Sequence, residues 1–200
     1  GHQIFRLMDR SDSEVLKRIC NRGISFRSCL ADDVLFVQET VCNEAYFVMN
    51  GMIDYTQRPL RSTVRSATQP EPKRATQGEW LSWAAMWSHW FHVGQAQMLQ
   101  TSEVLTVDVV VMMKCVDACG DLTNFFQQYS LAFHRRLVSA VPPAAVWPTD
   151  LSVPFTDFGE IVLSLGPREQ KFVGTKALQN LEQRSFVWKG MSMHAIQKLQ

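Results

Sequence analysis

Three side chains in the middle of the chain, Glu79, His89 and His92, are of types that ligate metal ions. Zinc sites use imidazole and carboxylate ligands, but they need three or four ligands that converge on one point. Cys115 and Cys119 are four residues apart and would share one face of a helix, but no nearby pair supplies two further ligands. The spacing therefore favours structural roles for these residues, and no metal is expected.

Signatures of catalysis are also missing from the sequence. There is no Gly-rich phosphate loop followed by Lys, no nucleophile elbow and no kinase catalytic loop. Glu79 and Ser82 do not form a catalytic dyad without a base, and Asp32-Asp33 is most simply a turn. We therefore expect a protein that is not an enzyme.

The elements that would position these side chains begin with residues 33–55, which predict the first strands of a small β-barrel. A buried strand over residues 46–49 runs into Asn50-Gly51. An Asn-Gly pair between apolar runs is typical of a type I′ hairpin turn, because both residues tolerate a positive φ. Residues 52–55 are then expected to return along the hairpin.

This stretch resembles the opening strands of a cyclic nucleotide-binding domain. The resemblance rests on Phe36, the turn at 41–43 with Glu44 after it, the run Ala45-Tyr46-Phe47-Val48, and Gly51, although Glu39 stands where that family commonly has Gly. A second block, from Gly78-Glu79 onward, falls where the family keeps its phosphate-binding cassette. The resemblance covers roughly residues 5–140. It implies an α+β, mainly β fold, in which a jelly-roll β-barrel is flanked by N- and C-terminal helices and residues 141–200 form an extension of unknown role.

In the resembled family, backbone amides of the cassette face the cyclic phosphate, a Glu accepts from the ribose 2′-hydroxyl, and an Arg pairs with the phosphate. The resemblance therefore implies these ligand-binding residues: Gly78, Glu79, Trp80, Leu81, Ser82, Gln95 and Ala96. Gln95-Ala96 best matches the place of the family's Arg-Ala pair, and no Arg or Lys lies between Trp80 and Val104. A loss of ~2–3 kcal/mol would weaken micromolar binding of cAMP or cGMP to about 0.1 mM. Weak or absent binding is expected, with no cofactor.

The cassette region also contains four tryptophans, whose spacings of three, four and three predict one side of a helix over about residues 81–91. They are Trp80, Trp83, Trp87 and Trp90. Two interpretations stay open. The rings could occupy the space of a nucleotide, or they could pack in the core, which is the commoner use of large aromatic side chains.

The rest of the chain predicts further elements around the barrel. A helix capped by Ser11 or Asp12 is expected to end near Gly23, a strand to cover 104–112, and an amphipathic helix to run from Asp121 to Val138. Beyond it, we expect a strand over 160–165 and a helix over 167–184.

Residues 57–77 differ in composition from the rest of the chain. They contain Arg58, Arg61, Arg65, Lys73 and Arg74 against one acid, Glu71, together with three prolines. This composition favours an extended, mobile loop between barrel strands. A solvated insertion is the simpler interpretation, and a docking or phosphorylation segment is the alternative.

Overall composition limits the partners and the location. A net charge of +1 gives no global field that would favour nucleic acid or an acidic membrane. The most apolar run, 104–116, is shorter than the ~20 residues of a membrane-spanning helix, so no direct membrane insertion is expected. Five cysteines at irregular spacing favour reduced thiols and a cytoplasmic location, which includes the cytosolic face of a membrane protein. The start without Met and without signal-peptide features indicates a processed or excerpted chain.

These observations lead to three hypotheses. The first is a non-catalytic regulatory domain of a larger signalling protein, such as a cation channel or a kinase, in which ligand capture at the cassette moves the C-terminal helix. The second is a nucleotide-independent protein-interaction module on the same barrel, with other domains of the parent, or an oligomer formed through it, as partners. The third is a small cupin-like metal enzyme that uses Glu79, His89 and His92, although the His-x-His pair of cupins is absent.

Overall fold

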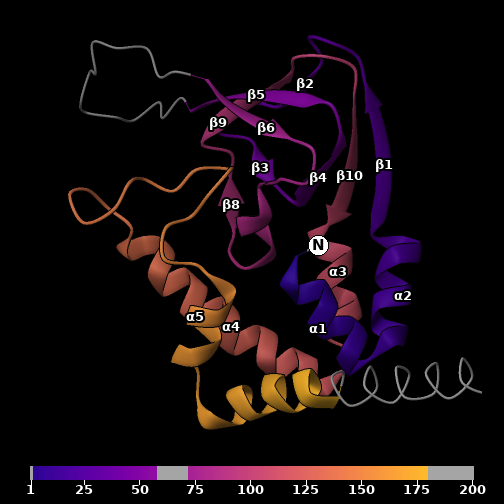
Figure 1. The fold of residues 1–200 in the computed structure, drawn as a ribbon, viewed down its shortest axis with the longest axis vertical. Helices are drawn as coiled ribbons and strands as arrows, with labels where there is room; N and C mark the ends of the chain where they lie inside the picture. The colour runs from indigo at the N-terminus through magenta and orange to yellow at the C-terminus, as the bar shows by residue number, and fades with distance from the viewer. Residues whose placement is uncertain (1, 58–71, 180–200) are drawn as a thin grey trace, which may run out of the picture.

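The computed structural model describes residues 2–57 and 72–179, and its centre is a pair of antiparallel sheets (Figure 1). The first sheet has the order β1 (Ile24–Cys29), β10 (Ser102–Asp108), β4 (Glu44–Asn50) and β7 (Trp80–Leu81). The second has the order β2 (Val34–Phe36), β9 (Gly94–Met98), β5 (Met52–Gln57) and β6 (Lys73–Thr76). A two-stranded ladder joins β3 (Val41–Cys42) to β8 (Trp90–Phe91).

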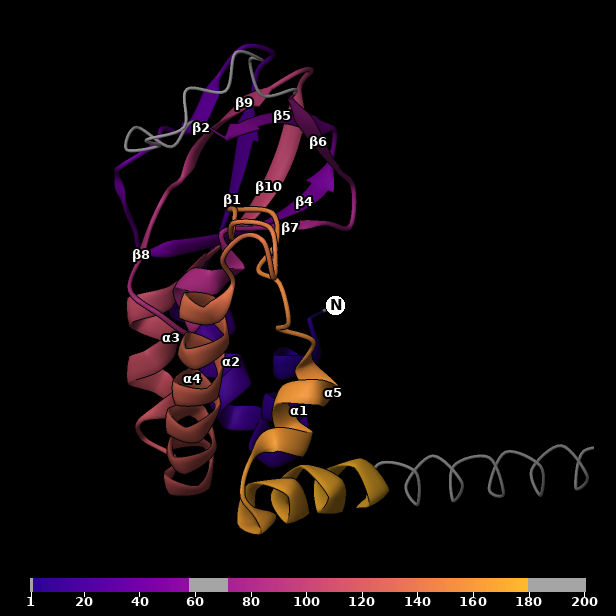
Figure 2. The ribbon, with the colours of Figure 1, turned by 90° about the vertical axis from the view of Figure 1, so that its left-hand side faces the viewer.

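Helices gather at one end of the barrel (Figure 2). They are α1 (Gln3–Ser11), α2 (Ser13–Arg22), the 3-10 helix η1 (Trp83–Met86), α3 (Val109–Val116), α4 (Gly120–Ser139) and α5 (Phe158–Ser164). Residues 167–179 are also helical. The predicted α+β fold class is confirmed, since a jelly-roll-like barrel of antiparallel sheets is flanked by helices from both ends of the chain.

Two helices, α2 and α4, follow their sequence signals. Asp12 caps α2, because its Oδ1 accepts from the backbone N of Glu14 at 2.9 Å. The amphipathic helix expected over residues 121–138 is α4, and its buried side chains recur at spacings of three and four. Those side chains are Leu122, Phe125, Phe126, Tyr129 and Phe133.

The hydrophobic core consists of two clusters. One lies between the sheets and includes Tyr46, Tyr55 and Leu81. The other lies among the helices, where Val153 and Ile161 of the C-terminal extension join the buried face of α4. The described part of the extension is therefore packed into the same core as the helices before it.

The turn at Asn50-Gly51 connects the two sheets, so the predicted type I′ hairpin is wrong. β4 pairs with β10 and β7, whereas β5 pairs with β9 and β6. Only Gly51 of the pair has a positive φ, 101°. A Cβ added to Gly51 would lie 2.1 Å from Ser102 Oγ, so the backbone passes directly against β10 as it crosses from sheet to sheet.

Two segments predicted as strands are partly or wholly helical in the structure. The strand expected over 104–112 ends at Asp108, whose Oδ1 accepts from the backbone N of Val111 at 2.9 Å and caps α3. The strand expected over 160–165 is wrong, because this segment belongs to α5. Asp157 caps that helix through a 3.0 Å bond from the backbone N of Glu160 to its Oδ1.

In the middle of the chain, a predicted helix is replaced by short strands and a 3-10 helix. No long helix covers residues 81–91; β7, η1 and β8 share this stretch, and the left-handed φ of 55° at Ser82 prevents a continuous helix. Part of the expected basic loop is a strand, because residues 73–76 form β6 and pair with β5. Residues 58–71 of that loop, and residues 180–184 of the last expected helix, lie outside the described residues.

Candidate functional site

A buried carboxylate, that of Asp150, lies against the last residue of the predicted cassette. Its side chain is 0% exposed. Oδ1 accepts hydrogen bonds from Ser82 Oγ at 3.2 Å and from Trp90 Nε1 at 2.8 Å, and it lies 3.0 Å from His92 Nδ1. Oδ2 accepts from Tyr55 OH and from the backbone N of Val93, each at 2.9 Å. Five groups from distant parts of the chain thus surround one carboxylate.

A tight turn presents Asp150 to this pocket. Thr149 Oγ1 accepts from the backbone N of Ser152 at 3.0 Å, and the backbone N of Thr149 donates to Ser152 O at 2.8 Å. The backbone of Asp150 is bound as well, because its carbonyl accepts from the backbone N of Ser82 at 2.6 Å. Both the side chain and the main chain therefore fix this residue in the pocket.

The walls of the pocket orient its donors. The ring of His92 stacks on Phe36, with centroids 3.8 Å apart and planes at 9°. Because a carboxylate can only accept, His92 must carry a proton on Nδ1 to donate to Asp150. Burial raises the pKa of the Tyr55 phenol, and the nearby Asp150 charge raises it further, so this group stays a donor.

Backbone strain is concentrated at the same place. Ser82 is fully buried and has a φ of 55°, a region that side chains other than Gly seldom occupy. Such strain persists where surrounding contacts hold the residue in place, and it occurs often at binding sites. Here the contacts are the two hydrogen bonds from Ser82 to Asp150. Ser82, the residue with the strained backbone, thus donates two hydrogen bonds to Asp150.

The structure separates the ligand-binding residues implied by the resemblance. Ser82 contacts Asp150, but Glu79 closes its own turn by accepting from the backbone N of Thr76 at 2.6 Å and from its Oγ1 at 3.0 Å. Gly78 lies in the same turn, with a φ of 93°. Leu81 is part of the core between the sheets.

The second part of the implied site lies on β9. Gln95 is placed opposite Thr56 of β5, and Ala96 is buried between the sheets. Neither residue donates to Asp150. The side chain that faces the carboxylate is instead His92, three residues before Gln95.

The tryptophans have separate environments. Trp87 packs against Phe126, Tyr129 and other side chains of α4, with centroids 5.1 Å and 4.3 Å from these two rings. Its role is core packing, as favoured from the sequence. Trp90 combines burial with a hydrogen bond to Asp150, so it also helps to fill the pocket.

The side chains of the metal hypothesis do not converge. His89 is exposed beside Phe91, His92 faces Asp150, and Glu79 binds Thr76. Among residues 2–57 and 72–179, no group of three His, Cys, Asp or Glu side chains could hold a metal ion. The third hypothesis therefore has no site in the described part of the chain.

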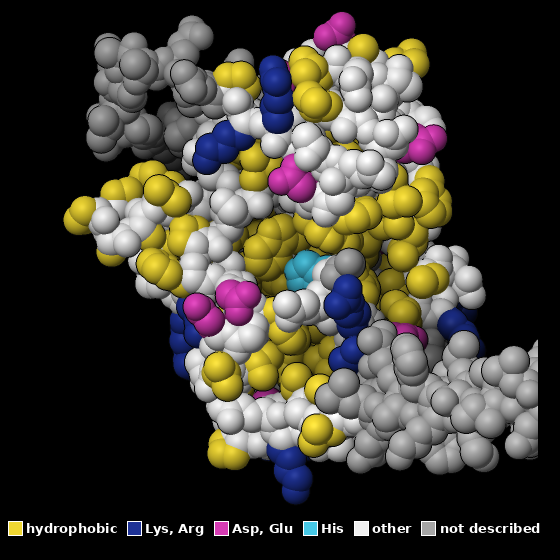
Figure 3. Space-filling model, viewed as in Figure 1, with side chains coloured by type: hydrophobic (Ala, Val, Ile, Leu, Met, Phe, Trp, Pro, Cys, Tyr) yellow, Lys and Arg dark blue, Asp and Glu magenta, His cyan; other side chains and the backbone are white. Residues whose placement is uncertain are grey.

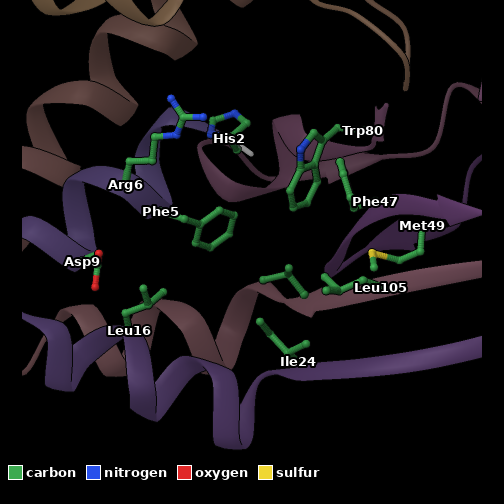
Figure 4. A pocket seen from close by; sticks show the side chains of 11 residues that line it. His2, Phe5, Arg6, Asp9, Leu16, Ile24, Phe47, Met49, Trp80 and Leu105 are labelled. Atoms are coloured by element: carbon green, nitrogen blue, oxygen red, sulfur yellow. The ribbon is translucent and has the colours of Figure 1, made fainter. Parts of the chain in front are cut away.

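A groove of about 380 Å³ lies on the outer face of the first sheet, between that sheet and the first two helices (Figure 4). Trp80 forms part of its wall, with its ring centroid 5.1 Å from that of Phe47 and 5.8 Å from that of Phe5. Arg6 and Asp9 supply charge. Trp80 thus faces this groove, while Ser82, two residues later, faces Asp150.

Comparisons with known proteins match the fold of the chain but not its sequence. No protein-family model and no curated protein matches. Among solved structures, a cyclic nucleotide-binding-like protein from Brucella abortus is 13% identical, with a TM-score of 0.44, and the match covers 58% of this chain and 99% of that one.

Two further structures come from a regulator and a channel. The sensor domain of the transcriptional regulator DNR from Pseudomonas aeruginosa is 12% identical, with a TM-score of 0.48 and coverage of 72% and 96%. The C-linker/CNBHD of zELK channels is 11% identical, with a TM-score of 0.48 and coverage of 64% and 61%. These structures are similar to this chain in fold alone, and what the chain binds has to be inferred from its own residues.

No local signal in the sequence indicates the pocket. Asp150 and Ser82 are 68 residues apart, and Asp150 and Tyr55 are 95 apart. Asp150 belongs to a segment that reads only as an extended connector between two prolines, Pro148 and Pro154. By residue type, His92 indicates a metal ligand and Trp90 an aromatic packing side chain, and neither indicates a carboxylate partner.

Proposed function

We propose that this chain is a non-catalytic regulatory module whose anion pocket is filled by its own Asp150. The observation that supports this proposal is the fully buried carboxylate surrounded by Ser82, Trp90, His92, Tyr55 and the amide of Val93. Five converging donor groups form a site for an oxyanion, because charge-assisted hydrogen bonds to an anion are about twice as strong as neutral ones.

An internal ligand has an advantage over a free one. A tethered group competes at an effective concentration in the millimolar range or above, so a soluble anion must exceed that value or bind more tightly. Among the residues that the structure describes, no Arg or Lys donates to the carboxylate, and His92 is the one basic side chain that contacts it. Both facts favour the Asp150-filled state over capture of cAMP or cGMP.

The pocket is connected to α4 by a second set of contacts. Arg136, in the last turn of α4, donates from Nη1 to Phe155 O at 2.6 Å and from Nη2 to Glu160 O at 2.9 Å. These bonds hold the chain just after Asp150 to the helix that the first hypothesis expects to move. Release of Asp150 would therefore change the contacts of α4 with residues 155–160. Another domain of the parent protein could bind one arrangement of α4 in preference to the other.

The first and second hypotheses then describe two states of the same domain, which differ in whether Asp150 occupies the pocket. With Asp150 in place, the barrel acts as a nucleotide-independent module. With Asp150 displaced, the five donor groups of the pocket would be free to bind the phosphate of cAMP or cGMP. A larger signalling protein, such as a channel, remains the expected parent, and the cytoplasm remains the expected location.

Calorimetric titration with cAMP and cGMP tests this proposal. The wild-type chain should show no binding below millimolar nucleotide, whereas Asp150→Ala should bind either nucleotide or inorganic phosphate more tightly. Asp117→Ala removes an exposed carboxylate at the end of α3 and is the matched control. Equal micromolar binding by the wild type and Asp150→Ala would show that Asp150 does not occupy the ligand site.

A further inference from the structure

The loop between α4 and Asp150 carries an apolar tip that projects from the molecule. Val146 is 70% exposed and Trp147 58%, and the nearby Val138 and Val141 are 60% and 40% exposed. The loop extends beyond the barrel at the left of Figure 1, and hydrophobic side chains cover this projecting edge in Figure 3. Apolar side chains on a convex projection are not explained by packing within the chain.

Both ends of this loop are fixed in the protein. Ala140 is fully buried at its start, and Thr149 and Asp150 are buried at its end. Within the loop, the backbone N of Ala145 donates to Val141 O at 3.1 Å, which forms a compact turn. The exposed side chains of Val146 and Trp147 are therefore held away from the core by an anchored backbone.

The tip has the chemistry of a surface that enters the interfacial region of a bilayer. No charged residue occurs between Arg136 and Asp150, so insertion would bury no charge. Tryptophan is enriched at the level of the lipid headgroups, where its ring is buried and its N–H can still bind a polar group. A convex tip also suits a deformable lipid surface.

Exposed cationic side chains occur on α4, which precedes the loop, and on β6. Arg135 is exposed in the last turns of α4. Lys73 is exposed on β6 directly opposite Tyr55, the residue whose hydroxyl binds Asp150. Figure 3 shows Lys or Arg side chains above and below the projecting edge. Near an anionic membrane, each such cation strengthens binding by about fivefold.

We propose that residues 141–148 form a membrane-contact loop that inserts Val146 and Trp147 into the interface of a bilayer containing anionic lipids. This contact is peripheral. No helix within the described ranges is long and apolar enough to cross a membrane, and the loop needs to enter only the headgroup region. The inference is independent of nucleotide binding, and it adds a membrane contact that the composition of the chain did not indicate.

Co-sedimentation with vesicles tests this inference. We expect the wild-type chain to pellet with phosphatidylcholine vesicles that contain phosphatidylserine, and several-fold less with phosphatidylcholine alone. The double variant Val146→Ser, Trp147→Ser should lose at least tenfold in binding, and Lys73→Gln a few-fold. Leu163→Ser, which changes a side chain of α5 that is 76% exposed, is the matched control and should bind as the wild type does.

Three results would overturn the inference. One is no pelleting with any vesicle, which would leave a protein as the partner of the tip. Another is equal binding by the double variant and the wild type. The last is an equal loss in Leu163→Ser, which would show general hydrophobic adhesion. Unchanged circular dichroism in each variant would confirm that the fold is intact, as expected for substitutions of exposed residues.

Discussion

Replacing Asp150 with Ala should destabilise the protein and leave a pocket that small anions can fill. The substitution removes the acceptor of Ser82 Oγ, Trp90 Nε1, Tyr55 OH and the Val93 amide, and the partner of His92 Nδ1. Each buried donor left without a partner costs about 1–3 kcal/mol, but water that enters the cavity recovers part of this. We expect a loss of ~3–5 kcal/mol in the free energy of unfolding, because several buried donors lose their acceptor at once.

The pocket left by this variant should recognise carboxylates. Acetate carries the same group as the Asp150 side chain, so it should bind the empty site and stabilise the native state. At an acetate concentration of about ten times its Kd, mass action adds ~1.4 kcal/mol. Chloride at equal ionic strength controls for general salt effects.

Urea unfolding followed by circular dichroism, with and without acetate, measures both quantities. Asp117→Ala should change the stability by less than about 0.5 kcal/mol, as surface substitutions usually do. A loss below about 1 kcal/mol in Asp150→Ala, with no gain from acetate over chloride, would refute the idea that five donor groups depend on this carboxylate.

Three further predictions concern single contacts. Glu39 has a φ of 63°, so Glu39→Gly should raise the free energy of unfolding by up to ~1 kcal/mol. If urea unfolding instead showed a lower free energy of unfolding, the backbone at Glu39 would not be strained. Gly51→Ala should lower it by ~2–3 kcal/mol, because its Cβ would lie 2.1 Å from Ser102 Oγ; a neutral effect would mean that the corner relaxes. Arg136→Gln should release residues 155–160 from α4 and speed their cleavage in limited proteolysis, whereas cleavage at the wild-type rate would exclude a clamp.

The barrel could be predicted from the sequence because its signals are local. The apolar run over residues 46–49 and the three-four spacing in α4 each describe one element, and both elements form as expected, the first within β4. The helix α5 could also have been predicted, since Asp157 and Glu160 have the spacing of a helix N-terminus with a cap. The apolar residues after them, Ile161 to Leu163, were instead interpreted as a strand.

The tryptophan spacing shows why the secondary structure of residues 81–91 is harder to predict from the sequence. Intervals of three and four are equally compatible with short strands and a 3-10 turn when each ring packs against a different partner. Trp80 packs beside Phe47, and Trp87 against Tyr129 of α4, so contacts with distant residues decide the local structure. The type I′ hairpin failed for a similar reason, because Gly51 turns the chain toward Ser102 of a strand that lies fifty residues later.

The proposed function gives Asp150 a role beyond stabilising the fold. An ionised carboxylate in a buried site loses its hydration, and such groups contribute little net stability even when they are fully hydrogen-bonded. An apolar side chain at position 150 would hold residues 149–153 on the barrel without that loss. A carboxylate differs from an apolar side chain in one useful respect, because another anion can replace it. Ser82, which holds a strained φ while it binds Asp150, is the residue that such an exchange would affect first.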